Sequence, residues 1–138
     1  MPFNKINHLA VFVAAIVFFL WGWLWYTIFG NQWLALVGKA AASMTPSPAP
    51  YVVGFLMALV LAYGTAIALA DSDRPGAAHG VSFGIFMGVI FYASTMLTGY
   101  LFEGRPLGLW LINAGYGLTG FALVGAIVGG WRKRAVAA

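Results

Sequence analysis

The sequence has no cysteine and carries very little charge. Only 7% of its 138 residues are Asp, Glu, Lys or Arg, whereas soluble domains carry about 25%. Without cysteine, the chain has no disulfide, no thiolate nucleophile and no thiol-ligated metal. No charged residue lies well inside any long apolar segment, so the ionisable groups of proton-coupled transporters and voltage sensors are missing. The composition excludes a soluble globular domain and disfavours active ion-coupled transport.

Groupings that carry catalysis are also missing. The sequence contains no Ser/His/Asp set, no metal-binding His motif and no Gly-rich loop for phosphate. Its two histidines, His8 and His79, fall at the ends of apolar segments, where we interpret them as solvated or facing headgroups. A two-histidine metal site would require the first and third apolar segments to adjoin. We therefore expect no enzymatic activity, no metal and no cofactor.

What the sequence does contain is apolar length. It is 62% hydrophobic with a mean hydropathy of +0.90. A helix that crosses a membrane needs about 20 apolar residues, and four segments qualify, approximately residues 8–29, 51–70, 81–102 and 107–131. We predict an all-α integral membrane four-helix bundle, built from two helical hairpins as a single domain over residues 1–138. The first segment is longer than a signal-peptide core, so we expect it to be retained as a span.

Basic residues are distributed unequally between the two ends of such a bundle. Four spans place both termini on one side, together with the linker of residues 71–79. That side carries five Lys and Arg residues and the opposite side carries two. The positive-inside rule then predicts cytoplasmic termini. The net charge of +4 is explained by membrane orientation, because the clustered basic residues are too few for a nucleic-acid interface. The expected partner is the lipid bilayer.

Small residues recur at every fourth position along the two middle segments. In a bilayer this spacing lets helix backbones approach closely and pack by van der Waals contact. We expect the stripe of the second segment to pack against that of the third as an antiparallel pair, and the last segment to offer a second contact surface. The expected packing positions are Gly54, Ala58, Ala62, Ala66, Gly80, Gly84, Gly88, Gly125 and Gly129.

Neutral polar residues in the last segment form the main candidate site. Asn113 lies seven residues after Pro106, which is about 10 Å along a helix, and Tyr116 shares its face. An amide at this depth needs a hydrogen-bond partner. Hydroxyl partners are available at Thr65, Ser94, Thr95, Thr98 and Thr119. Two interpretations stay open, polar packing between helices and a polar pocket for a ligand.

Aromatic residues gather at the same end of the bundle, beyond the first span and around the turn before the fourth. An aromatic belt at headgroup level explains them, and a flat surface for a lipid tail, quinone or pigment is the alternative. The residues are Trp21, Trp23, Trp25, Tyr26, Trp33, Tyr100, Phe102 and Trp110.

Two stretches carry a resemblance to a known family. Phe102-Glu103-Gly104-Arg105-Pro106-Leu107, followed by Leu111-Ile112-Asn113-Ala114-Gly115-Tyr116, resembles the C-terminal signature of a bacterial membrane family, domain of unknown function seventeen-sixty-one. The resemblance covers nearly the whole chain. It implies a small four-span inner-membrane protein without an established activity, in which Glu103, Arg105, Asn113 and Tyr116 are the candidate ligand-binding residues.

Three functions fit these observations. The first is a structural or accessory protein that self-associates or joins a larger membrane complex, because the small-residue stripes suit helix–helix packing. The alternative is a homo-oligomeric carrier or channel whose mouth is lined by Asn113, Tyr116 and the Glu103–Arg105 turn. The third is a lipid- or quinone-binding helper that uses the polar patch around Asn113 and the neighbouring aromatic residues.

Overall fold

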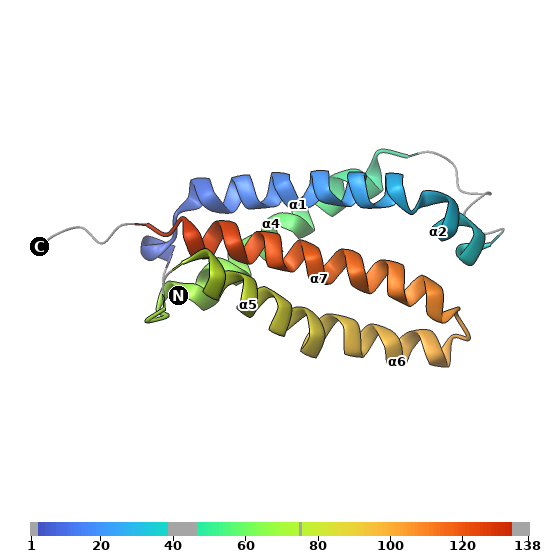
Figure 1. The fold of residues 1–138 in the computed structure, drawn as a ribbon. Helices are drawn as coiled ribbons and strands as arrows, with labels where there is room; N and C mark the ends of the chain where they lie inside the picture. The colour runs from blue at the N-terminus through green and yellow to red at the C-terminus, as the bar shows by residue number, and fades with distance from the viewer. Residues whose placement is uncertain (1–2, 39–46, 75, 134–138) are drawn as a thin grey trace, which may run out of the picture.

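Helices form nearly all of the described chain in the computed structural model, which describes residues 3–38, 47–74 and 76–133. The elements are η1 (Phe3–Lys5), α1 (His8–Ile28), α2 (Gly30–Val37), α4 (Ala49–Ala70), α5 (Ala77–Met87), η2 (Gly88–Ala93), α6 (Ser94–Phe102) and α7 (Leu107–Gly130) (Figure 1). Because α5, η2 and α6 run on without a break, the described residues form four helices that are long and apolar enough to cross a membrane. The prediction of an all-α protein with four such helices is confirmed.

Local sequence explains where these helices begin. The Asn7 side chain accepts a hydrogen bond from the Ala10 N–H at 3.2 Å and caps α1. Helix α4 begins two residues earlier than expected, because a proline is tolerated in the first turn of a helix. The turn before α7 reverses at Gly104, whose φ of 67° is a conformation that favours glycine. The expected outer loop lies partly in residues 39–46, outside the described residues.

Helix α7 lies at the centre of the bundle and contacts α1, α4 and α5 (Figure 1). Helix α4 packs on α1 and α7, and its expected stripe positions Ala58, Ala62 and Ala66 are buried there. Half of the buried side chains of this core are alanines, which lets the helices approach closely at those positions. Together they are Ile6, Val11, Ala14, Ala15, Ala58, Ala62, Ala66, Leu69, Val124 and Val128.

The expected pairing of the two middle helices is wrong. Helix α5 packs along α7, and its glycines face that helix instead of α4. A Cβ atom added at Gly80 would lie 1.8 Å from the carbonyl oxygen of Gly125, and one added at Gly84 would lie 2.2 Å from that of Phe121. A Cβ at Gly88 would lie 2.7 Å from the Leu118 side chain. The short turn before α7 makes the third long helix and α7 antiparallel neighbours, so the glycines of α5 and η2 lie against α7.

The second expected contact surface, on the last helix, is also used inside the chain. A Cβ atom at Gly125 would lie 2.0 Å from the Gly80 carbonyl oxygen, and one at Gly129 would lie 3.0 Å from that of Gly76. The Gly76 N–H donates to the Gly129 carbonyl at 3.1 Å, which ties the α4–α5 linker to the end of α7. Gly54 contributes to none of these contacts, since it is exposed and nothing lies within 4 Å of its Cβ position.

The third long helix widens into a π-helix at η2, which the sequence did not predict. The Ser94 N–H bonds to the carbonyl of Val89, five residues earlier, instead of the usual four. The extra residue in this turn changes the direction of the side chains, and the Tyr92 ring lies directly over α7. Gly117 makes room for it, because a Cβ atom there would lie 2.1 Å from Tyr92 Cε1.

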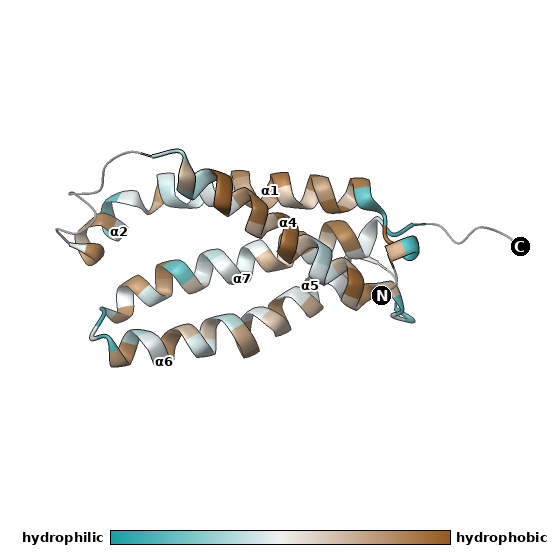
Figure 2. Ribbon diagram, turned by 180° about the vertical axis from the view of Figure 1, so that it is seen from behind, coloured by the Kyte–Doolittle hydropathy of each residue, from teal (hydrophilic) through white to brown (hydrophobic). Residues whose placement is uncertain are grey.

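Hydropathy along the ribbon separates the helices from their connections. Apolar residues dominate α1 and α4, and hydrophilic residues gather at the two ends of the bundle (Figure 2). One hydrophilic stretch also interrupts α7 toward its α6 end, in the part of the helix that contains Asn113 (Figure 2).

Candidate functional site

Asn113 lies on α7 at the centre of a hydrogen-bond network with three tyrosines from other elements. The hydroxyl of Tyr26 on α1 donates to Asn113 Oδ1 at 2.6 Å. Asn113 Nδ2 donates to the hydroxyl oxygen of Tyr100 on α6 at 2.7 Å. The Tyr92 hydroxyl on η2 donates to the main-chain carbonyl of Asn113 at 3.4 Å. One amide thus joins the three long helical segments at this end of the bundle.

The expected hydroxyl partners of this amide bond elsewhere. Each donates to a carbonyl of its own helix, in the way that Ser and Thr hydroxyls satisfy themselves in apolar helices. The side chains are Thr65, Ser94, Thr95, Thr98 and Thr119.

A cavity of about 530 Å³ lies beside the Asn113 network. Its volume is within the range of about 300–1,000 Å³ that small-molecule sites occupy. The walls are aromatic and apolar, with the Asn113 amide and the tyrosine hydroxyls as the polar groups. The lining residues are Tyr26, Gly30, Trp33, Leu34, Tyr92, Met96, Tyr100 and Asn113. Because none of the described lining residues is charged, this lining suits a neutral molecule.

The turn residues Glu103 and Arg105 do not line this cavity, although they are close to it. Arg105 Nε lies 2.6 Å from Glu103 Oε2, and both side chains are about half exposed. The Arg105 guanidinium carbon lies 5.1 Å from the centre of the Tyr100 ring, within the range of a cation–π contact. The pair therefore acts on the cavity through Tyr100, which it holds in place.

Tyr116 lies behind the cavity wall. Its ring centre is 5.2 Å from that of Phe18 and 5.3 Å from that of Tyr26. Of the four candidate ligand-binding residues, Asn113 alone lines the cavity. Tyr116 supports Tyr26, and Glu103 and Arg105 support Tyr100.

The sequence predicts some of the lining residues and not others. Tyr26, Trp33 and Tyr100 belong to the aromatic group that offers a ligand surface as the alternative to a belt, and their grouping is the signal for the cavity. Tyr92 and Met96 carried no signal, because their direction depends on the π-helix.

Most of the outer aromatic residues bridge helices, which the belt interpretation did not anticipate. Trp21 Nε1 donates to Thr119 Oγ1 at 3.0 Å, Trp25 Nε1 to the Ile112 carbonyl at 3.0 Å, and Trp110 Nε1 to the Ala93 carbonyl at 2.9 Å. Others face outward, with Trp23 68% exposed and Phe102 91% exposed. The inward-facing indoles fix the helices around the cavity.

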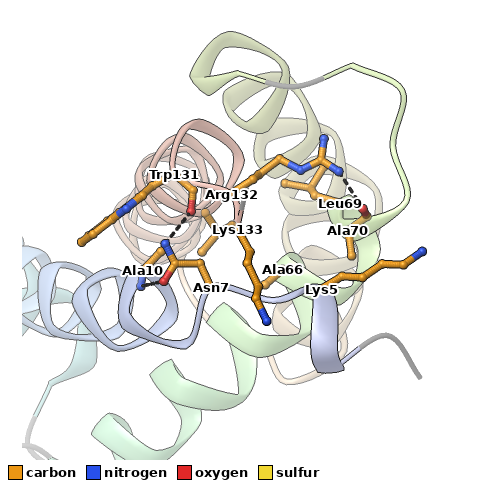
Figure 3. Close-up of a pocket in the computed structure, with 10 residues that line it drawn as sticks. Lys5, Asn7, Ala10, Ala66, Leu69, Ala70, Trp131, Arg132 and Lys133 are labelled. Carbon is orange, nitrogen blue, oxygen red and sulfur yellow. Dashed lines mark hydrogen bonds between the residues drawn. The ribbon is translucent and has the colours of Figure 1, made fainter. Parts of the chain in front are cut away.

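The opposite end of the bundle is basic and closed. The Arg132 guanidinium donates to the carbonyl of Ala70, the last residue of α4, at 2.6 Å (Figure 3). It also donates to the carbonyl of Ser72 at 3.0 Å, and so satisfies carbonyls at and just beyond the end of the helix. Asn7 Nδ2 donates to the Trp131 carbonyl at 3.2 Å (Figure 3). The cavity among these side chains measures about 10 Å³, which is room for about one water. The described residues of this end tie the start of α1 and the end of α7 to the α4–α5 linker and enclose room for about one water.

Ionisable groups at this end make local pairs. Lys5 Nζ lies 2.5 Å from Asp71 Oδ1, and this hydrogen bond lowers the pKa of Asp71 from its usual 3.8. His8 Nδ1 lies 3.0 Å from the Tyr63 hydroxyl, and His79 Nε2 lies 3.0 Å from Ser72 Oγ. The two histidines therefore bond to different neighbours and do not form the two-histidine site considered from the sequence.

The fold and the site define a small all-α protein with four helices able to cross a membrane and an aromatic cavity at one end. Its sequence matches, over residues 9–129, the model of the family described as "Protein of unknown function (DUF1761)", and the chain belongs to this family. The family resemblance seen in the sequence is confirmed. No curated protein and no solved structure matches the chain.

Proposed function

We propose that this protein binds a neutral amphipathic small molecule inside the membrane, in the cavity beside Asn113. The observation that carries the proposal is the lining of that cavity, whose described residues are aromatic or apolar and uncharged around one hydrogen-bonded amide. Binding sites for small ligands combine apolar walls with a few placed polar groups in this way. The accessory function ranked first from the sequence loses support, because Gly80, Gly84, Gly125 and Gly129 are used within the chain.

We propose further that the cavity faces the outer leaflet of the inner membrane and that both termini are cytoplasmic. Among the described residues, one end carries Lys5, Arg74, Arg132 and Lys133, and the cavity end carries Arg105. Cytoplasmic ends of membrane proteins are enriched in Lys and Arg, and anionic headgroups attract such residues.

Co-purification tests the proposed function with two matched variants. We would purify the protein in mild detergent and identify bound small molecules by mass spectrometry of the intact complex. Gly30 lines the cavity and Gly54 is exposed on α4, and nothing lies within 4 Å of either Cβ position. We expect a recurrent neutral molecule that Gly30→Leu loses and Gly54→Leu keeps. An empty wild-type protein, or equal retention by both variants, would refute the proposal.

A second candidate function is the accessory role, as a subunit of a homo-oligomer or of a larger membrane complex. An apolar groove of about 260 Å³ lies between α4 and the third long helix. It is lined by Leu61, Gly64, Thr65, Ala68, Phe83, Gly84, Met87, Phe91 and Phe121. Gly64 is exposed with open space around its Cβ position, so another helix can approach closely there.

The intact-complex masses test this second candidate. A stoichiometric second protein, or a multiple of this chain, that is lost in Gly64→Leu would support it. A homo-oligomer that also carries the small molecule would favour the carrier alternative, and a monomer throughout would exclude both.

A further inference from the structure

We propose that the molecule in the cavity presents a carbonyl oxygen, which accepts hydrogen bonds from the Tyr100 hydroxyl and the Asn113 amide. This inference rests on the proposed function and specifies the chemistry of the ligand. A ring carbonyl of a quinone and the ester carbonyl of a lipid share this chemistry.

With the Asn113 amide oxygen facing Tyr26, the direction of each bond in the network follows from the donors and acceptors present. A primary amide offers two N–H donors and one carbonyl oxygen, and a phenol offers one donor. The Tyr26 proton is used on Asn113 Oδ1. One Nδ2 proton of Asn113 is used on the Tyr100 oxygen, so the Tyr100 proton points elsewhere. Among the described residues no group accepts the Tyr100 proton or the second Nδ2 proton, and both side chains line the cavity.

The network therefore has two donor protons without an acceptor among the described residues, whereas each of its side-chain oxygens at Asn113 and Tyr100 already accepts a hydrogen bond. An oxygen with one bond tolerates an unused second lone pair. A proton without an acceptor in an apolar environment is the costlier deficit. A ligand that brings a hydrogen-bond acceptor into the cavity is therefore favoured over one that brings a donor. An uncharged carbonyl oxygen meets this demand without bringing charge into an uncharged cavity.

The walls favour a ligand with a flat or extended body. The Tyr26 and Trp33 rings form an aromatic corner, with ring centres 6.0 Å apart and planes at 75°. Met96 lines the cavity with a flexible side chain that adapts to shape. The Arg105 guanidinium lies over the Tyr100 ring and keeps its hydroxyl in position while a ligand exchanges.

Two matched ligand pairs test the proposal on the purified full-length protein by isothermal titration calorimetry in detergent. The first pair is a short-chain quinone and an alkylbenzene with the same tail, which lacks the carbonyl. The second pair is a diacyl phosphatidylcholine and its dialkyl ether analogue, which lacks only the ester carbonyls. We expect the carbonyl-bearing member of one pair to bind about tenfold more tightly, the effect of about one good hydrogen bond. The pair that shows the difference identifies the source of the carbonyl.

A variant pair assigns the effect to the cavity. Tyr100→Phe removes one of the two donors and keeps the ring, so we expect the preference for the carbonyl ligand to fall while the Asn113 donor remains. Tyr63→Phe makes the same chemical change at the other end of the bundle, where Tyr63 bonds to His8, and should keep the preference. The ligand comparison on the wild-type protein needs no variant, so it stays decisive if Tyr100→Phe folds poorly.

The outcomes separate this inference from the proposed function. If carbonyl-bearing and carbonyl-free ligands bind equally well, the inference is overturned and the proposed function stands. If none of the four ligands binds and the purified protein holds no small molecule, both fail. If the quinone binds tightly but Tyr100→Phe leaves its preference unchanged, the donor assignment is overturned.

Discussion

Replacing Gly84 with Ala should separate α5 from α7 and destabilise the protein. The added Cβ would lie 2.2 Å from the main-chain carbonyl oxygen of Phe121, whereas ordinary van der Waals contact begins at 3.4 Å. The difference of 3.4 − 2.2 = 1.2 Å must come from the helices, because both sides of this contact are backbone. A gap of about 0.5–1 Å already removes a quarter to a half of each dispersion contact.

The magnitude follows from two opposing effects. Overpacking of this kind typically costs about 1–3 kcal/mol. Alanine also has a helix propensity better than that of glycine by about 1 kcal/mol, which offsets part of the loss. Gly54→Ala is the matched control, since it gains the same propensity and meets no atom within 4 Å. We therefore expect Gly84→Ala to be less stable than Gly54→Ala by about 1–3 kcal/mol.

The assay is unfolding in mixed micelles of rising denaturing-detergent content, followed by far-ultraviolet circular dichroism. The double variant Gly80→Ala with Gly84→Ala extends the test. Once one Cβ has separated the helices the second clash is partly relieved, so the double variant should lose less stability than the two single losses added together. Equal stability of Gly84→Ala and Gly54→Ala would show that α5 and α7 are not in backbone contact, and the reasoning would fail.

Three further changes test other contacts by the same unfolding assay. Asn113→Leu leaves the Tyr26 proton without its acceptor, and should cost about 1–3 kcal/mol; a loss no larger than that of Leu-for-Asn at an exposed position would contradict this role. Arg132→Gln removes a guanidinium that bonds to two carbonyls and should lower the free energy of unfolding. Arg132→Lys should lower it less, because lysine keeps the charge but cannot donate to both carbonyls with a planar guanidinium. Because Lys5 lowers the pKa of Asp71 from 3.8, their pair stabilises the folded chain above that pH and is lost as the pH falls through the lower folded value. The free energies of unfolding of wild type and Asp71→Asn should therefore differ slightly at neutral pH and converge as the pH falls below 3.8 and through the lower folded pKa of Asp71.

Sequence predicted the long helices because their formation depends on length and apolarity alone. Which helices pair could not be predicted in the same way, because a small residue at every fourth position indicates a close helix–helix contact but does not identify the partner helix. Gly80 meets Gly125 because the short α6–α7 turn fixes the register of the two helices, and that register is a property of the folded turn. The expectation that the small residues of α4 are buried in helix packing holds in part, since Ala62 is buried and Gly54 is exposed.

The candidate site, like the fold, could be predicted from the sequence only in part. The depth of Asn113 along its helix was readable from its distance to Pro106, so its need for partners could be predicted. Which partners it has was not readable, because serine and threonine hydroxyls satisfy themselves on their own helices and leave the amide to tyrosines. The Tyr92 side chain reaches the network through a π-helix, and no spacing rule for a regular helix places it there.

The packing of α7 against the third long helix explains why, among the described residues, the cavity at the aromatic end measures about 530 Å³ and the one at the basic end about 10 Å³. Near the termini, glycines on both helices bring backbone against backbone, and Arg132 closes the remaining space at α4. Toward the α6–α7 turn, side chains as large as Tyr92 and Trp110 lie between the helices, and their ribbons stand apart (Figure 1). Close packing at the basic end is thus combined with separation at the aromatic end. Polar atoms in that separated region need hydrogen-bond partners, and the Asn113 network supplies them. In the binding proposed above, the Tyr100 and Asn113 protons that this network leaves without an acceptor among the described residues make the cavity select a ligand with a carbonyl oxygen.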